Sequence, residues 1–271
     1  MMNDVINIPI WRLSFCYGLF FLVYVLVWMK HLNLSKDLLF SMVRMTVQLT
    51  LMGLVLTRIF QIESWLLISL LYLTMLFFAM QTIVRRSGIT FPNIHRLLFI
   101  SLLGGAGTVF LFFIFFVVNS EPWYNPRYFI PIGGMILGNS MNGSALALER
   151  FYDDVHVRRR EIETLIALGA TAREAAGSSF RKAYRAALLP MMMSMSGMGL
   201  VFLPGMMTGQ ILGGSPPLIA IKYQIAIMSA IMGSLAFTTY LILSLEYHQF
   251  FDKFHLIREN IFIHKDKRKS S

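Results

Sequence analysis

The sequence predicts an all-α integral membrane protein with about seven transmembrane helices, and three observations support this fold class. Of the 271 residues, 56% are hydrophobic and only 14% are charged, whereas soluble domains carry about 25% charged residues. The apolar residues form runs of about 20, the length an α-helix needs to cross ~30 Å of hydrocarbon. Lys and Arg gather in alternate connections between these runs. A bilayer sorts basic residues in this way, so the net charge of +10 indicates a membrane rather than a nucleic acid.

Each apolar run is predicted to be one membrane span. The seven spans are residues 10–29, 38–60, 65–84, 97–118, 129–148, 187–204 and 221–245. The first is longer than the apolar core of a signal peptide and no small-residue cleavage site follows it, so we expect it to be retained. We expect one membrane domain over residues 1–251, and a basic cytoplasmic tail over 252–271 that lies near anionic headgroups.

The basic residues also predict the orientation of the chain. The connection between the fifth and sixth spans is the richest, with Arg150, Arg158, Arg159, Arg160, Arg173, Arg181, Lys182 and Arg185. The positive-inside rule assigns it to the cytoplasm, which places the N-terminus outside and the C-terminus inside. The aromatic residues Trp65, Trp123, Tyr124 and Tyr128 then fall in outer loops, where such side chains anchor helices at the interface.

The connection over about 149–186 is predicted to be a helical extension of the fifth span followed by a second helix. Apolar residues recur at helical spacing as far as Leu168, without proline or glycine. Gly169 fits a helix C-cap, because glycine adopts positive φ without penalty. After Ala170, Thr171 and Glu174 form the pattern of a capping box, which starts a helix from Ala172 to about Ala187 that leads into the sixth span.

Two interpretations of this connection remain open on the residue pattern. A short cytoplasmic helix at an angle to the membrane can seat in a partner protein and transmit its motion as a rigid body. Leu168, Gly169, Ala170, Thr171 and Glu174 would then form a partner-coupling surface. Alternatively, the segment is an amphipathic connector on the membrane surface whose Arg and Lys bind anionic lipid.

The fifth span contains candidate pathway residues. Gly134 and Gly138 form a G-x-x-x-G pair, which lets membrane helices approach closely. Asn139 and Asn142 lie at membrane depth, where an amide needs a partner. These two amides either line a transport pathway or hydrogen-bond neighbouring helices in a tight bundle.

The end of the sixth span contains candidate gate residues in a run broken by proline and glycine. They are Pro204, Gly205, Met206, Met207, Gly209 and Gln210. Irregular backbone at membrane depth is tolerated only where protein buries it or where it lines a wet cavity, so the run predicts an outer gate or re-entrant turn; a plain extracellular loop is the alternative. The nearby methionines, from Met191 onward, suit soft ions such as Cu(I), or act as flexible packing between helices.

The sequence argues against an ATP-binding site, a catalytic site and a metal site of buried carboxylates. There is no G-x-x-x-x-G-K-[ST] motif, so the chain lacks a P-loop for ATP. The histidines fall in loops, ends or the tail, and no nucleophile–base set lies at membrane depth, so we do not expect an enzyme. Asp and Glu are missing from the middle of every span, so no site of buried carboxylates for a hard metal is visible and any metal site stays unknown.

Three motifs carry a resemblance to a known family. They are IPIGGMILGNSMN at 130–142, ALGAT at 167–171 and LPGMMTGQILGGSPPLIAIKYQI at 203–225. With these motifs, the sequence resembles the bacterial iron-export ABC permeases of the FetB type, and is similar to plant aluminium-tolerance permeases. The similarity runs over nearly the whole chain and is strongest from 130 to 230.

The resemblance implies a function and its partners. It implies a multi-pass permease subunit in a bacterial plasma membrane that exports a metal ion, with iron as the expected cargo. The subunit would act as a homodimer with a separate ATP-binding subunit, so that ATP and Mg²⁺ belong to the partner and this chain needs no cofactor. An ATP-independent channel or facilitator for an ion or small solute remains the alternative, and a scaffold without cargo is a weaker one.

Overall fold

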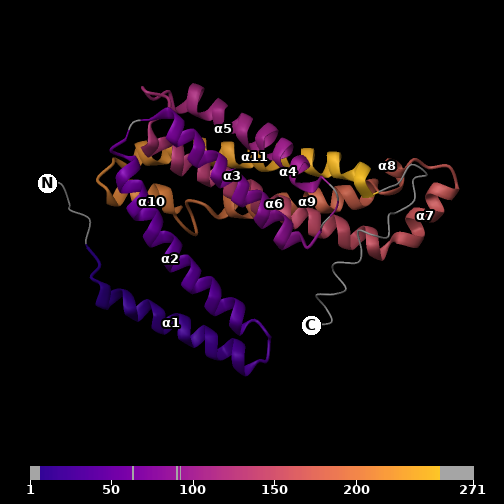
Figure 1. Cartoon of the computed structure of the whole chain (residues 1–271), viewed down its shortest axis with the longest axis horizontal. Coiled ribbons are helices and arrows are strands. Elements are labelled where there is room, and N and C mark those ends of the chain that lie inside the picture. Colours follow the sequence, from indigo (N-terminus) through magenta and orange to yellow (C-terminus); the bar gives the residue numbers. More distant parts are fainter. Residues whose placement is uncertain (1–6, 63, 90, 92, 251–271) are drawn as a thin grey trace. The chain divides into compact units, whose positions relative to one another are not determined.

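The protein is helical throughout the part that the structure describes. The structure is a computed structural model, and it describes residues 7–62, 64–89, 91 and 93–250. The predicted tail at 252–271 lies outside these residues. Within them the helices run from α1 to α11 (Figure 1), and the one bridge joins Met198 and Phe202. The chain divides into two units, one of residues 1–63 with 209–215 and one of residues 64–208 with 216–271.

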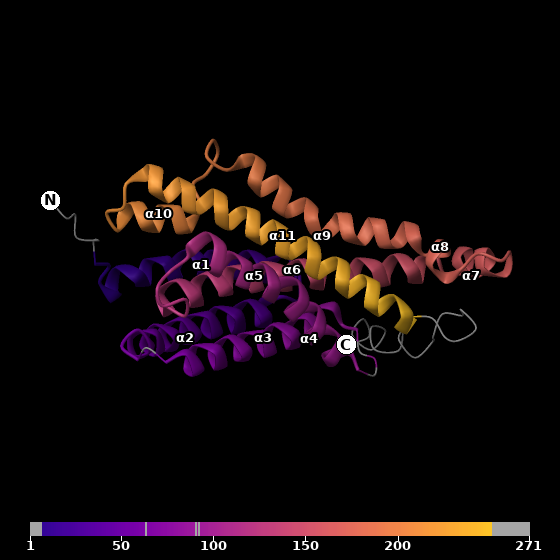
Figure 2. The same cartoon turned by 90° about the horizontal axis from the view of Figure 1, so that it is seen from above.

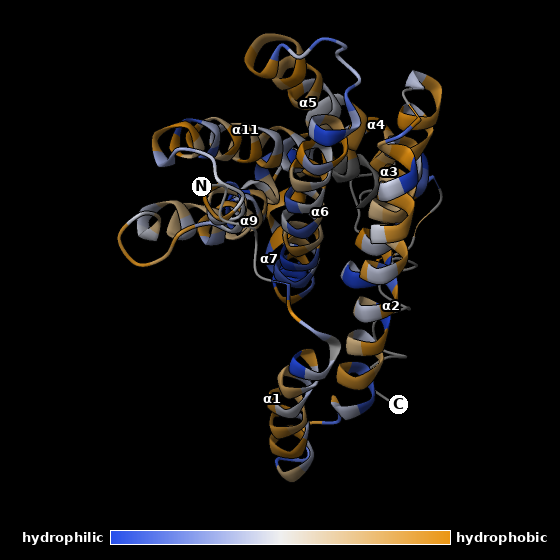
Figure 3. Cartoon of the chain, turned by 90° about the vertical axis from the view of Figure 1, so that its left-hand side faces the viewer, coloured by the Kyte–Doolittle hydropathy of each residue, from blue (hydrophilic) through white to orange (hydrophobic). Residues whose placement is uncertain are grey.

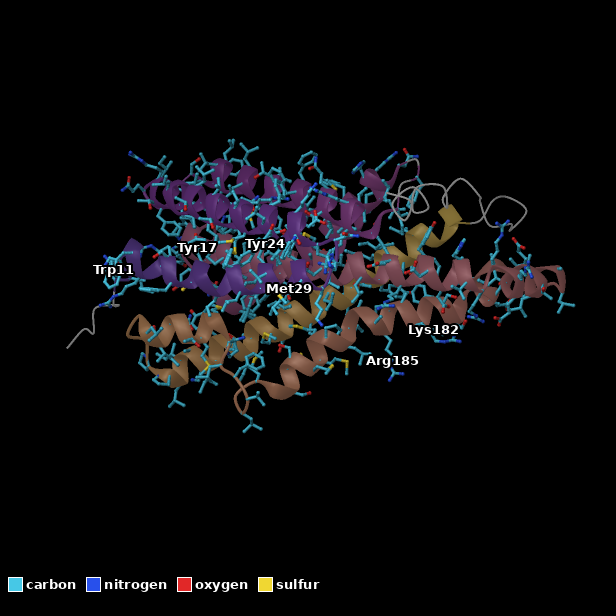
Figure 4. All side chains as sticks on the ribbon, turned by 90° about the horizontal axis from the view of Figure 1, so that it is seen from below. Trp11, Tyr17, Tyr24, Met29, Lys182 and Arg185 are labelled. Carbon is cyan, nitrogen blue, oxygen red and sulfur yellow. The ribbon has the colours of Figure 1, made fainter. Side chains whose placement is uncertain are left out.

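The first unit contains a hairpin of two apolar helices. α1 (Ile10–Met29) and α2 (Ser35–Ile59) are joined by a short turn in which His31 and Asn33 adopt positive φ. The Tyr17 hydroxyl of α1, labelled in Figure 4, lies 3.1 Å from the Thr46 hydroxyl of α2. None of the most apolar stretch of either helix is buried within the protein. Such exposed apolar helices are stable in lipid, because their backbone hydrogen bonds are all satisfied internally.

The second unit is a bundle around α6. Its long elements are α3 (Trp65–Ser87), the span from Ile94 to Val118, α6 (Pro126–Val157), α9 (Gly177–Gly197) and α11 (Pro217–Phe250). α6 packs against α3, α9 and α11, and α11 also packs against α4 and α9 (Figure 2). Ile136, Leu148 and Phe151 of α6 are fully buried. The core of this unit therefore follows α6 along its length.

Local sequence explains where α6 begins. The Asn125 side chain accepts a hydrogen bond from the Arg127 backbone N–H at 3.1 Å, and Pro126 occupies the first helical position, where its missing N–H costs nothing. One turn further on, the Phe129 ring packs edge-on against Phe110, with centroids 4.7 Å apart. Phe110 stacks on Tyr72 at 4.8 Å. This aromatic cluster joins α3, α5 and α6.

The span from Ile94 to Val118 includes two stretches of π-helix. It consists of α4 (Ile94–Leu102), η1 (Leu103–Gly107), α5 (Thr108–Phe112) and η2 (Phe113–Val118), where η marks the π-helical turns. η1 carries three glycines and touches α11 closely. A Cβ placed on Gly105 would lie 2.6 Å from the Thr238 Cα. Only glycine therefore fits at this crossing.

Three short helices complete the chain. They are α7 (Arg159–Ala167), α8 (Ala172–Ala175) and α10 (Gly205–Leu212). α7 is strongly hydrophilic, as its blue colour in Figure 3 shows, and it follows α6 directly. α8 leads into α9 through Ala176.

Five of the seven predicted spans are confirmed as helices long and apolar enough to cross a membrane. They are Trp11–Met29, Ser35–Ile59, Trp65–Ser87, Ile94–Val118 and Pro217–Leu245. α6 and α9 contain the other two predicted spans but are less apolar. Much of α6 is buried against other helices through glycine, serine and alanine, and helices in such positions need small residues rather than apolar ones. The count of seven and the orientation stay predictions.

Three predicted boundaries were wrong. The helix after the fifth span was expected to continue to Leu168, but it breaks at Arg158, where φ is −97° and ψ is 15°. The helix from Ala172 was expected to be continuous, but it breaks at Ala176. The sixth span was expected to reach residue 204, but α9 ends at Gly197 and Gly199 has a φ of +85°. Proline at 190 stands inside α9 without ending it.

Candidate functional site

The turn between α7 and α8 has the geometry predicted for it. Gly169 adopts a φ of +96°. Its N–H donates to the Ile166 carbonyl at 2.9 Å, and the Ala170 N–H donates to the Leu165 carbonyl at 3.0 Å. These two bonds form a Schellman motif, which satisfies the last carbonyls of α7. The turn is therefore a defined structure and not a loose loop.

The start of α8 is fixed by the predicted capping box. The Glu174 N–H donates to the Thr171 hydroxyl oxygen at 3.3 Å, and the Thr171 N–H donates to the Glu174 carboxylate at 2.8 Å. The Thr171 hydroxyl also donates to that carboxylate, and these bonds lower the pKa of Glu174. The cap holds α8 at a fixed angle to the turn.

We call α7, the turn 168–171 and α8 together the elbow. Ile162 of α7 and both Ala172 and Ala175 of α8 are buried, so the two helices pack against each other. By contrast, the Leu168 side chain is 79% exposed at the tip of the turn. The elbow thus combines a rigid frame with an apolar side chain presented outward.

A polar network centred on Asp154 fastens the elbow to the bundle. The Ser179 hydroxyl and the Lys182 ammonium of α9 donate to the Asp154 carboxylate of α6 at 2.6 and 2.9 Å. Arg158 lies 3.6 Å from the same carboxylate, and it also binds Ser178 and pairs with Glu161 of α7. Figure 4 labels Lys182 on α9. One carboxylate therefore ties α6 to α9, and Arg158 extends the network to α7.

The network sets the ionisation of Asp154. Burial of the carboxylate opposes ionisation, but hydrogen bonds from Ser179 and Lys182, with the charges of Lys182 and Arg158, outweigh it. They hold the pKa of Asp154 below its ordinary value of 3.8. The carboxylate is thus charged at neutral pH, when the network is complete.

Acidification is expected to remove the stability that this network contributes. Because the pKa of Asp154 is lower in the folded protein than in the unfolded one, the contribution is fully present above the unfolded value of 3.8 and is lost as pH falls through the folded value. Thermal unfolding of the detergent-purified protein would be compared with that of Asp154→Asn between about pH 7 and pH 3. The wild type should lose its advantage over the variant only below about pH 4. A constant advantage down to pH 3 would contradict this assignment.

The candidate pathway residues of α6 face different neighbours. The Asn142 side-chain oxygen accepts a hydrogen bond from Arg86 of α3 at 2.8 Å, while Asn139 donates to the Met135 carbonyl of its own helix at 2.8 Å. A Cβ on Gly134 would lie 3.1 Å from the Met75 methyl group, but one on Gly138 would meet nothing within 4 Å. Asn142 thus joins helices, as one of the two interpretations expected, and its pathway role stays a prediction.

Buried hydroxyl groups on α4, α6 and α11 were not predicted from the sequence. The Ser140 and Ser234 hydroxyls are 3.0 Å apart across α6 and α11. Other fully buried hydroxyl residues of these helices are Ser101, Ser144, Thr238 and Thr239. Small hydroxyl residues let helices approach closely in a bilayer. Serines and threonines scattered over distant helices gave no local signal that they would meet.

Two of the candidate gate residues, Pro204 and Met207, line a cavity in the second unit. The cavity has a volume of about 430 Å³ and lies between the end of α9, the segment 198–204, α10 and α11. Pro204 and Met207 line it, together with Met195, Met198, Gln224 and Met228. Gly205 and Met206 begin α10, and Gly209 and Gln210 belong to its second half. The residues Gly134, Gly138, Asn139 and Asn142 do not line this cavity, so the two candidate sets are separate there.

The usual metal-binding side chains do not cluster in the part of the chain that the structure describes. There, no group of three or more His, Cys, Asp or Glu side chains could hold a metal ion. Cys16 of α1 is exposed.

Comparison with known proteins places the chain in a family. The model of the uncharacterised protein family UPF0014 matches residues 10–251. The chain is 37% identical over 223 residues to the UPF0014 membrane protein slr1647 of Synechocystis sp., covering 82% of this chain and 86% of that protein. It is 34% identical over 241 residues to Protein ALUMINUM SENSITIVE 3 of Arabidopsis thaliana, covering 89% and 87% of the two chains. Its identity to the probable iron export permease protein FetB of Escherichia coli is 33% over 237 residues, covering 86% and 90%.

No solved structure matches the chain. The family that the motifs at 130–142, 167–171 and 203–225 predicted is nevertheless confirmed, since the matches span almost the full length of both partners. The helices α1, α2, α3, the span Ile94–Val118 and α11 agree with the membrane location of these relatives. The chain is therefore a multi-pass membrane protein that belongs to the UPF0014 family.

Proposed function

We propose that this chain is the membrane-spanning permease subunit of an ABC exporter for a metal ion, energised by a separate ATPase. The relative from Escherichia coli is named a probable iron export permease, so iron is the first cargo to test. The sequence has no P-loop motif, so ATP and Mg²⁺ would be bound by the partner. We place the protein in a bacterial plasma membrane, with its N-terminus outside and the elbow in the cytoplasm.

The elbow is the observation that carries the proposal. A coupling element must be rigid, must be exposed and must be attached to helices that can move. The Schellman turn and the capping box make the elbow rigid, and Leu168 is exposed at its tip. Arg158 binds Glu161 of α7 and lies beside Asp154, and so attaches the elbow to the network that joins α6 and α9. An amphipathic connector that only binds lipid would need none of these attachments.

The geometry suggests how force would travel. Closure of two ATPases on a permease homodimer would press on each elbow, and the Asp154 network would pass the displacement to α6 and α9 as one body. α9 ends at Gly197, where the non-helical segment 198–204 begins. Bending at this segment would shift Pro204 and Gly205 and open the outward end of the pathway.

Purification of the tagged chain from its native membranes tests the proposal. We expect a P-loop ATPase to co-purify, and we expect inside-out vesicles that contain both proteins to accumulate radioactive iron only when ATP and Mg²⁺ are supplied. Vesicles with a non-hydrolysable ATP analogue are the control. Purification without an ATPase, together with metal flux that needs no ATP, would overturn the proposal and support a channel or facilitator.

A further inference from the structure

The cavity beside α10 has an unusual lining for the proposed exporter of a hard metal ion. Four methionines, Met195, Met198, Met207 and Met228, line it with the amide of Gln224. They come from α9, from the segment after it, from α10 and from α11. Among the described residues that line the cavity, none has a carboxylate, imidazole or thiol group. The side-chain donors available to a ligand there are therefore the thioether sulfurs, the amide of Gln224 and the hydroxyl of Ser229, which already donates to the Ile225 carbonyl at 3.0 Å.

The side chain of Gln224 is buried at the cavity but is only partly hydrogen-bonded. The residue is 6% exposed, and its Nε2 donates to the Met198 sulfur at 3.8 Å. Its Oε1 has no hydrogen-bond partner among the described residues. Buried amides are almost always satisfied, so this unpaired oxygen marks a place where a bound species or its water is to be expected. The bond to Met198 also fixes the position of one sulfur.

The space itself argues against a purely structural role for the methionines. Methionine is a good gap filler, because three rotatable bonds let it occupy irregular spaces. Here, however, about 430 Å³ is left open between them. Met207 is 9% exposed, whereas Met195 is 39% exposed at the edge of the cavity. The cavity thus has a buried end and an accessible end.

We propose that this cavity binds a soft monovalent metal ion, Cu(I) or Ag(I), through the thioether sulfurs of Met195, Met198, Met207 and Met228. Thioethers are soft ligands that favour Cu(I), while iron and aluminium favour carboxylates and other hard oxygen donors. The described residues of the lining include no carboxylate, and their only side-chain oxygens are those of Gln224 and Ser229. The apolar character of the cavity also favours an ion of low charge. The cost of moving an ion into an apolar site rises with the square of its charge, so a monovalent ion pays far less than a divalent or trivalent one.

The flexibility of the ligands makes the site possible. The four side chains reach the cavity from separate segments, and rotation about their three side-chain bonds lets the sulfurs converge on one ion. Gln224 acts as a positioning residue, since its N–H holds Met198 towards the cavity. The site goes beyond the proposed function, because binding requires neither an ATPase nor transport.

Titration of the purified full-length chain with Ag(I), which is not subject to redox change, provides the test. We expect one ion to bind per chain, and we expect X-ray absorption at the metal edge to show sulfur neighbours only. Replacing all four methionines by leucine conserves volume and should leave the thermal midpoint close to that of the wild type. Affinity for Ag(I) should fall by at least about 100-fold, since even the loss of an outer partner costs a metal site about 10–100-fold.

A matched control uses methionines of the same helix that lie outside the cavity. Met192 and Met193 of α9 are 50% and 73% exposed, and neither lines the cavity. The double variant Met192→Leu with Met193→Leu should bind Ag(I) like the wild type. The proposal is overturned if the wild type does not bind Ag(I) stoichiometrically, or if the quadruple cavity variant retains wild-type affinity while it remains folded. Neither result bears on co-purification with an ATPase, so the proposed function stands or falls separately.

Discussion

Replacement of Gly105 by alanine is expected to destabilise the bundle more than replacement of either of the other two glycines of η1. The added Cβ would lie 2.6 Å from the Cα and 2.7 Å from the backbone nitrogen of Thr238. Real Cβ atoms do not approach backbone so closely, and α11 cannot rotate its main chain away as a side chain would. Either η1 or α11 must move, and overpacking of this kind costs about 1–3 kcal/mol or more.

The neighbouring Gly104 provides the control. A Cβ there would meet only the Leu241 methyl group, at 3.5 Å, which is an ordinary contact. Gly104→Ala should therefore have the thermal midpoint of the wild type in detergent, while Gly105→Ala should unfold several degrees lower. Equal midpoints for the two variants would show that η1 and α11 do not cross as closely as the structure has them.

Replacement of Gly169 by valine is expected to uncouple ATP hydrolysis from transport while leaving the protein in the membrane. The φ of +96° at this position is costly for a β-branched residue. The penalty for left-handed backbone is about 1–2 kcal/mol per residue. No atom lies within 4 Å of the added Cβ, so the turn is the part that yields. A changed turn would redirect α8 relative to α7, and force from the proposed ATPase partner would no longer reach α6 and α9.

Gly169→Asn is the matched variant, because asparagine tolerates left-handed backbone far better than valine. Both proteins would be reconstituted with the ATPase, and ATP hydrolysis and metal flux would be measured in the same vesicles. Valine should lower the flux per ATP hydrolysed at least severalfold, and asparagine should restore most of it. If the valine variant transports as much metal per ATP hydrolysed as the wild type, the turn at Gly169 does not transmit the force, even where the ATPase partner is confirmed.

The turn at Gly169 and the capping box of α8 were predicted because their signals are local. Positive φ at Gly169 follows from the missing Cβ, and the capping box follows from Thr171 and Glu174 standing three residues apart. Such features depend on a few consecutive residues. The breaks at Arg158 and Ala176 were not predicted, because neither residue is a helix breaker. The breaks lie beside contacts between distant residues, since Ser179 binds Asp154 and Arg158 binds Ser178, pairs that are 25 and 20 positions apart in the sequence.

Among the candidate functional residues, too, some were predicted from the local sequence and others are brought together only by the tertiary structure. The proline and glycine pattern predicted that Pro204 and Met207 belong to a gate, and both residues line the cavity beside α10. Gln224 and Met228 lie on α11 and reach that cavity only because α11 returns beside α9. Asp154 was not singled out from the sequence, because its partners Ser179 and Lys182 lie on another helix, although it is the centre of the network between α6 and α9.

The sequence by itself determined the class of the protein, the positions of five helices long and apolar enough to cross a membrane, and the turn at Gly169, because hydropathy, helix length and capping act over neighbouring residues. Tertiary structure alone decided that Gly105 meets Thr238, that Asp154 binds Ser179 and Lys182, and that four methionines face one cavity. Helices that are apolar along their whole length can pack on any face. Small residues, hydroxyl pairs and buried charges on separate helices decide which faces meet. These groups are far apart in the sequence, so their contacts can be identified only once the helices are packed together.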